Sequence, residues 1–285
     1  MSPSPDKRQS PLIREDFLRE DLCELSPLIW KKQLCHLECV RPGRGGKISD
    51  YYLLLRNAET GEELSHFAEG YGLASAYVHD DVFYAFASRW EEDAWNDIPL
   101  FCCSDLIHWE GRKVVDQEGG EHLFNSSVCS GPDGFVMAYE SNDPTYPAFT
   151  TKFVRSNDLQ NWQKIPEAIF GTNRHTANPC IRYSRSYYYM LYLEHRKPRH
   201  YFETYITRSP DLIYWETSVA NPILVPENTD EGINTSDPEI VELDGRTHLL
   251  LCRRRPTHQG ERQASRLSRY FAEFLRILVR STRPT

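Results

Sequence analysis

One short motif recurs at a fixed interval in this chain, and that repeat limits the folds that the chain can adopt. Trp109, Trp162 and Trp215 lie 53 residues apart, and Asp-Leu stands four and three positions before each of them. The three copies read "CSDLIHWEG", "RSNDLQNWQ" and "RSPDLIYWE". A period of this length indicates a repeat architecture, in which each copy is one small unit that buries its apolar face against its neighbours.

The segments between these tryptophans read as β-hairpins. Each contains a short apolar strand, a polar turn and a second strand rich in β-branched and aromatic residues. Three copies read "ASAYVHDDVFYAFASR", "NSSVCSGPDGFVMAYES" and "ANPCIRYSRSYYYMLYLEH", and two more read "LSPLIWKKQLCHLEC" and "TSDPEIVELDGRTHLLLC". Five units of about fifty residues predict an all-β chain, a five-bladed β-propeller in which each blade is a four-stranded antiparallel sheet.

The repeated motif is expected to close a blade. The Asp of such a turn accepts hydrogen bonds from its own backbone, the Leu fills the space between blades, and the Trp covers the sheet. We therefore assign the motif a structural role and not a catalytic one.

The repeats divide the chain into three parts. The propeller is expected over residues 20–252, between a flexible N-terminal segment (1–19) and an Arg-rich tail (253–285). A chain of 285 residues can bury one core as a single all-β domain. The eight Cys are scattered, with no CxxC pair or Cys/His cluster at zinc spacing, so we expect reduced thiols and neither a metal nor a cofactor.

The charge is unevenly distributed. The last 33 residues contain nine Arg, no Lys and two acids, which leaves 24 basic and 39 acidic residues in the rest, a net charge of about −15. An acidic body argues against a nucleic-acid partner. The N-terminal "MSPSPDKRQSPLIREDF" has no apolar run, and no other stretch approaches the length of a membrane span. The sequence thus predicts a cytoplasmic protein without a signal peptide or a membrane span.

The C-terminal tail departs from the blade pattern. Apolar residues recur there with helical spacing, at Leu267, Phe271, Phe274, Leu275 and Leu278, which predicts an amphipathic basic helix. Such a helix would cap the propeller base or bind an acidic or membrane surface. An Arg-rich, Lys-free segment is also what an out-of-frame translation of a GC-rich gene would give. In that case the fifth sheet lacks outer strands, and the N-terminal "PLIREDF" would partly pair with it.

The hairpin opened by "SDPEIVELDG" and the turns "RSPDLIYWE" and "RSNDLQNWQ" resemble those of the five-bladed propeller glycoside hydrolases, the broad group that includes families 43, 32, 62, 117 and 130. The resemblance covers about residues 20–252 and implies a carbohydrate or glycoside substrate. Gly-His/Trp-Asp pairs and di-glycine signatures at blade spacing, the marks of WD and kelch propellers, are missing from the sequence.

In a propeller of this kind, inner strands begin and second strands end at the same rim, so these positions line a funnel. Alignment of the hairpins places the starts of the inner strands at Ser26, Ser75, Ser127, Asn178 and Asp237. The resembled family 43 pattern has an Asp base on the first blade, a second Asp on a middle blade and a Glu acid further on. Ser26 and Ser127 depart from that pattern.

Catalysis of glycoside hydrolysis needs one protonated and one ionised carboxyl group. Asp237, at a predicted strand mouth, is the first candidate, and its alternative role is to cap a turn. Glu194 and Glu140 end neighbouring second strands, and either would serve as the acid with a pKa raised by the apolar strands around it. As rim glutamates in water, they would have no such role.

Acidic residues also recur in the loops that lead into the inner strands. Six residues before each aligned position stand Glu20, Glu69, Glu121, Thr172 and Glu231. A structural reading, which we favour, has them accept backbone N–H bonds in the turns between blades. A functional reading has them place negative charge in the funnel, with Glu121 and Glu231 as the substrate-binding candidates.

Other polar and aromatic side chains are candidates for binding the sugar. Asn125 and Asn178 lie at the rim, and His175 and His195 would orient a hydroxyl group there or remain ordinary hydrogen-bonded histidines. The loop "SRWEEDAWND" contributes further candidates, namely Arg89, Trp95 and Asp97. The alternative for this loop is a surface aromatic that covers a blade edge.

Two functions follow from these expectations. The first is a metal-independent glycosidase that uses Asp237 with Glu194 or Glu140. The second is a non-catalytic carbohydrate-binding propeller, which the serines at positions 26 and 127 favour.

Overall fold

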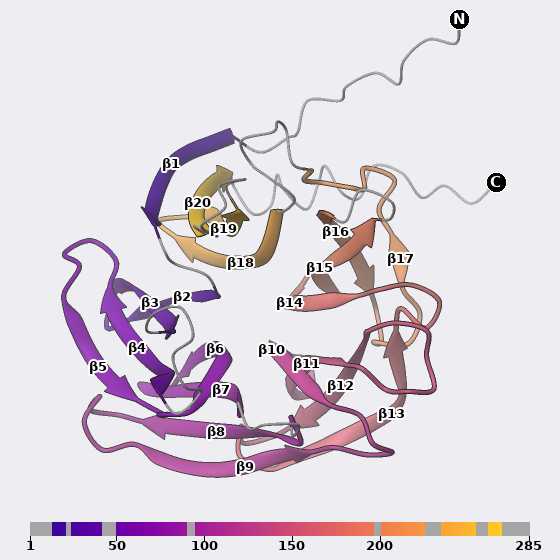
Figure 1. The fold of residues 1–285 in the computed structure, drawn as a ribbon, viewed down its shortest axis with the longest axis horizontal. Helices are drawn as coiled ribbons and strands as arrows, with labels where there is room; N and C mark the ends of the chain where they lie inside the picture. Colours follow the sequence, from indigo (N-terminus) through magenta and orange to yellow (C-terminus); the bar gives the residue numbers. More distant parts are fainter. Residues whose placement is uncertain are drawn as a thin grey trace, which may run out of the picture.

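The computed structural model describes residues 13–20, 24–41, 50–89, 95–196, 201–225, 235–254 and 262–269. These residues form antiparallel sheets of four strands each and contain no α-helix (Figure 1). Accordingly, the part of the chain that the structure describes has no helix that could span a membrane.

The described strands group into five sheets, four of which are built from consecutive strands. The first contains β2 (Leu25–Trp30), β3 (Gln33–Val40), β4 (Tyr52–Asn57) and β5 (Glu63–Phe67). The second contains β6 (Tyr71–His79), β7 (Val82–Arg89), β8 (Asp97–Cys103) and β9 (Glu110–Asp116). The third contains β10 (Leu123–Gly131), β11 (Gly134–Ser141), β12 (Thr150–Ser156) and β13 (Trp162–Phe170). The fourth contains β14 (Ala177–Ser184), β15 (Tyr187–Arg196), β16 (Tyr201–Ser209) and β17 (Glu216–Thr217).

The fifth sheet combines the two ends of the chain. Its order is β18 (Thr235–Leu243), β19 (Arg246–Arg254), β20 (Arg262–Arg269) and then β1 (Ile13–Glu20). The N-terminal segment pairs with this sheet, but not with a sheet that lacks outer strands as we predicted: β1 pairs from Ile13 to Glu20 with β20, a strand that the tail supplies. Residues 13–19 are therefore part of a sheet, and our expectation of a flexible segment there is wrong.

The helix predicted for the tail is also wrong where the structure describes the chain. Arg262–Arg269, which includes Leu267, is strand β20 and pairs with both β19 and β1. A strand here satisfies the backbone N–H and C=O groups at the edge of β19, and helical periodicity of side chains does not outweigh that pairing. The other apolar positions of the predicted helix, residues 271–278, lie outside the described residues.

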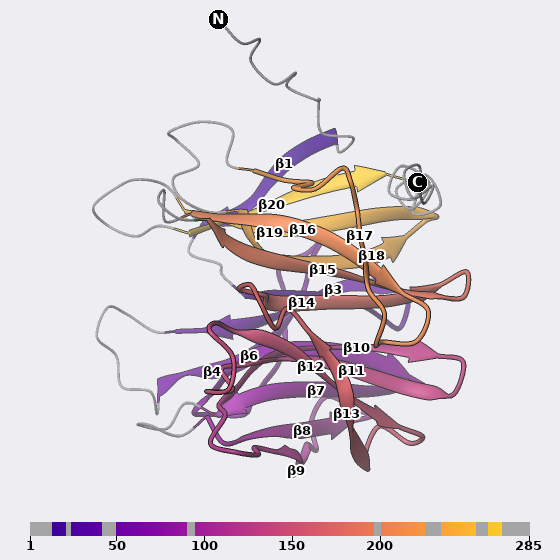
Figure 2. The same cartoon turned by 90° about the vertical axis from the view of Figure 1, so that its right-hand side faces the viewer.

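The sheets surround a common axis. The inner strands contact one another in cyclic order, β2 with β6, then β10, β14, β18 and β2 again (Figure 1). Figure 2 shows the strands running between the two faces of this ring, so that each face consists of strand ends and loops. The all-β propeller predicted from the repeats is confirmed, as are the five hairpins.

The core lies between neighbouring sheets. Along β7, Phe83 and Ala85 belong to the apolar cluster shared with the first sheet, whereas Tyr84 and Phe86 belong to the cluster shared with the third. Successive side chains point to opposite faces of a strand, and both faces are covered here. This double burial explains why β7 is a nearly continuous apolar run and does not alternate.

The repeated turn has the structural role that we predicted. Asp158 Oδ1 accepts the backbone N–H groups of the second and third residues after it, at 2.9 and 2.7 Å. Leu159, at φ 61°, is fully buried between the second and third sheets. The Trp162 indole donates to the Leu159 carbonyl at 3.0 Å. The other two copies make the same Asp-to-backbone bonds.

We expect Asp158→Ala to lower the free energy of unfolding by about 1–2 kcal/mol, because the turn loses side-chain acceptors while Leu159 keeps an unfavourable positive φ. Urea denaturation followed by tryptophan fluorescence measures this. Glu167→Ala, at an exposed position on the neighbouring β13, is the control and should change stability by less than about 0.5 kcal/mol. Equal stability of the two variants would contradict the role given to the turn.

Candidate functional site

The inner strand of each sheet has a residue in the left-handed backbone region just before it or among its first three residues. The φ angles are 60° at Glu24, 52° at Leu73, 26° at Asn125, 47° at Asn178 and 54° at Asp237. In the last four, the pairing with the neighbouring strand shifts register at this residue, as in a β-bulge. A bulge re-aims a side chain that would otherwise point between the sheets.

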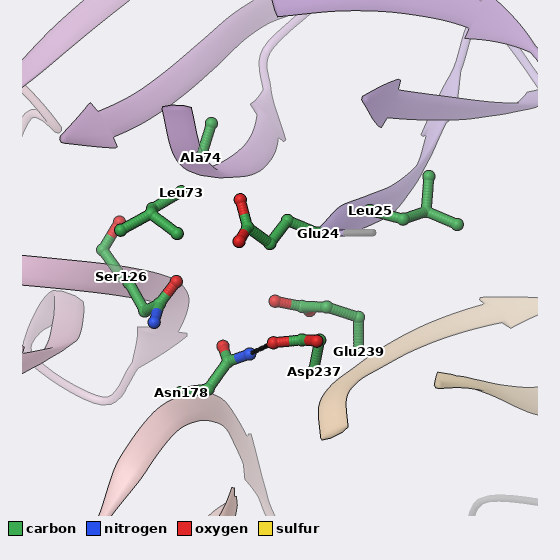
Figure 3. Close-up of a pocket in the computed structure, with 9 residues that line it drawn as sticks. Glu24, Leu25, Leu73, Ala74, Ser126, Asn178, Asp237 and Glu239 are labelled. Atoms are coloured by element: carbon green, nitrogen blue, oxygen red, sulfur yellow. Dashed lines mark hydrogen bonds between the residues drawn. The ribbon is translucent and has the colours of Figure 1, made fainter. Parts of the chain in front are cut away.

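These five positions all line one pocket at the axis of the ring (Figure 3). The pocket and its opening to solvent measure about 280 Å³. Its other lining residues are Leu25, Ala74, Ser126 and Glu239. Five repeats thus place equivalent side chains in one space, and two of those side chains, Glu24 and Asp237, are carboxylates.

Our alignment of the strand starts is wrong by two residues in the first three repeats. Ser26 and Ser127 follow the left-handed residue by two positions and join neighbouring inner strands. Their hydroxyl oxygens accept the N–H groups of Ala76 and Ile181, at 3.0 and 3.1 Å. The position that we took as a serine in the first repeat is therefore Glu24. The 53-residue period contained the signal, because Asn125 and Asn178 lie 53 residues apart, as the tryptophans do.

Asp237 is the predicted catalytic residue that the structure places directly in the pocket. The side-chain amide of Asn178 donates to its Oδ1, and the Ser236 hydroxyl donates to its Oδ2 at 2.7 Å. Hydrogen bonds to both oxygens orient the carboxyl group in the pocket. Figure 3 shows Asp237 and Asn178 reaching toward each other from neighbouring strands, beneath Glu24.

Glu140 lies directly behind the pocket wall. Its Oε2 accepts the Asn125 side-chain amide at 2.8 Å and the Asn178 backbone N–H at 2.9 Å, and both of these asparagines line the pocket. Burial raises the pKa of Glu140 to about 7, and the charge of Asp237 adds to this shift, although the two hydrogen bonds oppose it. Glu140 thus positions two lining residues and responds to the charge inside the pocket.

The buried Glu140 predicts a stability that depends on pH. Its carboxyl keeps a proton in the folded protein up to about pH 7, whereas the unfolded chain releases that proton near pH 4.5. The folded state then binds more protons between these values, so this group makes stability fall as pH rises from about 4.5 to 7 and has no further effect above. In Glu140→Gln, the decrease in the free energy of unfolding between about pH 4.5 and 7 should be about 3 kcal/mol smaller than in wild type.

Urea unfolding at steps from pH 4.5 to 8 tests this prediction as the difference between wild type and variant. Glu167→Gln, an exposed substitution of the same kind on β13, should follow the wild-type curve. If Glu140→Gln and wild type lose stability in parallel across this range, the buried carboxyl is not protonated as proposed.

Glu239 lines the pocket two residues after Asp237, a position that sequence reasoning missed. Burial raises its pKa to about 7, and the charge of Asp237 contributes, against the opposing charge of Arg182. The Arg182 Nη2 lies 3.6 Å from its Oε2. Glu239 follows the left-handed Asp237 by two positions, as Ser26 and Ser127 follow theirs, and those serines accept a backbone N–H from the next inner strand. The corresponding β2 residue for Glu239 is Pro27, which has no backbone N–H. The missing donor gives a physical reason for its carboxyl to face the pocket.

Glu24 forms the opposite wall of the pocket. Both of its carboxylate oxygens accept hydrogen bonds from the Arg41 guanidinium. Together, Glu24, Asp237 and Glu239 place three carboxyl groups around one space (Figure 3). Glu24 and Asp237 accept hydrogen bonds from Arg41 and Asn178, and burial raises the pKa of Glu239.

Glu194, our other predicted acid, lies outside the pocket lining. It is buried near the end of β15, where it accepts the Tyr192 hydroxyl at 3.2 Å and lies 3.6 Å from the Arg174 guanidinium. Adjacent repeats therefore do not bring Glu194 and Glu140 to equivalent roles, because the bulged strand starts, and not the ends of the second strands, face the axis.

Glu121 has the structural role that we favoured for the loop glutamates. It is fully buried and accepts the Glu118 backbone N–H at 3.1 Å, the Ser141 hydroxyl at 2.6 Å and the Lys152 ammonium at 2.7 Å. Burial opposes its charged form, but the bonds from Lys152 and Ser141 hold its pKa below the usual value. Glu231 lies outside the described residues.

The remaining candidates lie at the same end of the sheets as the pocket but do not line it. The Arg89 guanidinium is 5.7 Å from the Tyr71 ring centroid, and Asp97 is 3.9 Å from the Lys113 ammonium. Trp95, His175 and His195 contact other aromatic rings of that face. Among the predicted binding residues that the structure describes, only Asn125 and Asn178 thus line the pocket.

Within the described ranges, no group of three or more His, Cys, Asp or Glu side chains is arranged to hold a metal ion. The three pocket carboxyls are instead satisfied by Arg, Asn and Ser donors. Acid–base chemistry is what this set of side chains supports directly.

Comparison with known proteins places the fold. No protein-family model matches the sequence, and no curated protein matches it. Similar solved structures include a glycoside hydrolase with a TM-score of 0.64 and 12% identity, over 91% of this sequence and 91% of the other. A GH43 endo-arabinanase from Bacillus licheniformis gives a TM-score of 0.60 at 8% identity, over 85% of this chain and 92% of the other.

A GH32 β-fructofuranosidase from Bombyx mori gives a TM-score of 0.52 at 21% identity, over 66% of this chain and 43% of the other. At these identities the likeness shows the fold alone. The chain therefore has the propeller fold found in the glycoside hydrolases that its repeats resemble.

Proposed function

We propose that this protein is a glycoside hydrolase-like enzyme that cleaves a glycosidic bond in the axial pocket by acid–base catalysis. The observation that carries the proposal is the convergence on one pocket of Asp237, Glu24 and Glu239, with the pKa of Glu239 raised to about 7. Glycosidases use one carboxylate and one carboxylic acid, which different environments keep in different protonation states. The proposal treats the five sheets as blades of a single ring with the pocket on its axis.

Each carboxyl takes a role that its contacts favour. Asp237, held by Asn178 and Ser236, is the ionised group that activates water or attacks the anomeric carbon. Glu239 is the acid that donates a proton to the leaving oxygen, since a pKa raised to about 7 keeps it protonated below that pH. Glu24, held by Arg41, contributes negative charge that stabilises the oxocarbenium-like transition state.

Glu140 is a positioning residue in this scheme. It touches Asn125 and Asn178 and not the pocket itself, so it acts by fixing the asparagine that orients Asp237. We had expected Glu140 or Glu194 as the acid. The pocket lining favours Glu239 over both.

A panel of 4-nitrophenyl glycosides tests the proposal. The names of the similar structures include an arabinanase and a β-fructofuranosidase, so the panel includes α-L-arabinofuranoside, β-D-xyloside and β-D-galactoside, with sucrose as a fructofuranoside. Release of product by wild type, lost in Asp237→Asn, supports the enzyme. Wild-type turnover that persists in that variant would remove the assignment.

A non-catalytic carbohydrate-binding propeller is the second candidate. One observation favours it: each pocket carboxyl is already engaged by a side chain of the protein, Arg41 for Glu24, Asn178 for Asp237 and Arg182 for Glu239. Saturable binding of a glycan without any release of product, unchanged by Asp237→Asn, would establish this function in place of hydrolysis.

A further inference from the structure

An aromatic strip extends over the pocket face of three consecutive sheets. We define it as Trp95, Phe124, Phe149, His175, His195 and Phe202. Each of these residues lies in a loop or at a strand end on the side where the inner strands begin, because alternate strands of each sheet run in opposite directions. All six side chains are half-buried, so each keeps part of its surface open to solvent.

The rings of this strip contact one another in sequence. Trp95 and Phe124 have centroids 5.0 Å apart, Phe124 and Phe149 5.6 Å, and Phe149 and His175 5.5 Å. Phe202 completes the strip at 5.8 Å from His175 and 5.2 Å from His195. The result is one continuous apolar surface contributed by the second, third and fourth sheets.

The strip and the pocket lie at the same end of the sheets, and two chain segments contribute to both. Phe124 directly precedes Asn125 and His175 stands three residues before Asn178, and both asparagines line the pocket. Phe124 also pairs with Glu140, which holds those two asparagines. The strip is therefore held next to the pocket by residues that also position the pocket asparagines.

The chemistry of the strip fits a sugar chain. Aromatic rings present large, rigid apolar faces at little cost in conformational entropy, and they pack against the C–H faces of sugar rings while hydroxyl groups remain hydrated. Burial lowers the pKa of His175, so that ring is uncharged at neutral pH and belongs to the apolar surface. The acidic body of the chain disfavours a nucleic acid on the same surface.

We propose that the ligand is a glycan chain of several sugars, which lies along the aromatic strip with one end in the axial pocket. This inference rests on the proposed function and deepens it, since the pocket alone would serve a small glycoside equally well. It assigns the strip the role of binding the sugars that flank the cleaved bond.

Affinity electrophoresis in gels that contain arabinan, xyloglucan or inulin tests the inference. At least one polymer should slow the wild-type protein in a concentration-dependent way. Phe149→Ala and Phe202→Ala should each weaken that binding about threefold to tenfold, because each removes one ring from the surface. Phe202→Leu, which keeps apolar volume without the ring, separates loss of stacking from loss of folding.

Tyr214→Ala is the matched control, because Tyr214 is an aromatic residue that is 74% exposed in a turn at the opposite end of the sheets. It should bind as wild type does. The inference is overturned if no polymer slows the wild type, or if the strip variants bind with wild-type affinity. Retardation that depends on the strip without hydrolysis by wild type would instead remove the proposed catalysis and leave the inference standing.

Discussion

Asp237→Asn is expected to lower kcat on the responsive aryl glycoside about a thousandfold, because the amide can neither accept a proton nor attack carbon. The fold should survive, since Asn is among the residues that tolerate the left-handed conformation found at this position, φ 54°. Asn also replaces the carboxylate with a group of the same shape. Initial rates and circular dichroism measured on the same preparation separate catalysis from folding.

Asp244→Asn is the matched control for that variant. Asp244 lies in the same sheet with φ 51°, but it is exposed in the β18–β19 turn, at the end of the strands away from the pocket. Its rate should equal that of wild type. A similar loss in both variants would mean that a general effect on the fifth sheet, and not the loss of the pocket carboxylate, lowers the rate.

Glu239→Gln should remove the alkaline limb of the pH–rate profile. In wild type the acid is protonated below about pH 7, so kcat/KM should be highest there and fall as pH rises through that value. The Gln variant cannot donate a proton, and we expect its rate on a poor leaving group to fall about a hundredfold and to lose this pH dependence. On a 2,4-dinitrophenyl glycoside, whose leaving group needs no proton, the loss should be small.

Glu242→Gln, on the same strand but exposed, should keep the wild-type profile. In Asp237→Asn the alkaline limb of the residual activity should shift to lower pH than in wild type, because the charge of Asp237 contributes to the raised pKa of Glu239. A wild-type alkaline limb in Glu239→Gln would show that another group donates the proton. Glu140, with a similar pKa, would be the next residue to replace.

The two pocket carboxyls on β18, Asp237 and Glu239, are coupled through that charge, and Glu140 is coupled to Asp237 and Glu24 on the two sides of the pocket. Asp237 raises the pKa of Glu239 and of Glu140, so ionisation of one group disfavours ionisation of the others. We therefore expect effects of double substitutions among these residues to be non-additive. Kinetic pKa values from the pH profiles will describe the group as a whole.

The repeats and the turns could be predicted from the sequence because they depend on local chemistry. Asp158 accepts backbone N–H groups two and three residues away, and Trp162 bonds to the carbonyl three residues before it. Such contacts lie within one stretch of chain, so the spacing of Asp, Leu and Trp reveals them. The five hairpins follow in the same way from runs of β-forming residues and their turns.

The site could be predicted only in part. Asp237, Asn125 and Asn178 were found, whereas Glu24 and Glu239 were missed. In the first three repeats a serine directly precedes the first apolar residues, so an alignment on that residue placed the pocket position two residues too late. Glu239 faces the pocket where Pro27 of the first repeat, more than two hundred residues away in sequence, offers no N–H.

By itself the sequence determined the number of hairpins, the blade-closing turns and the acidic character of the body, and it identified Asp237 as a candidate. Only the tertiary structure decided that Glu24 faces Asp237 and Glu239, that Glu194 lies outside the pocket lining, and that residues 262–269 form a strand between β19 and β1. The physical reason is that hydrogen bonds within a turn depend on neighbours in sequence. Convergence on an axis, burial and the resulting pKa shifts depend on strands that meet only once the ring has formed.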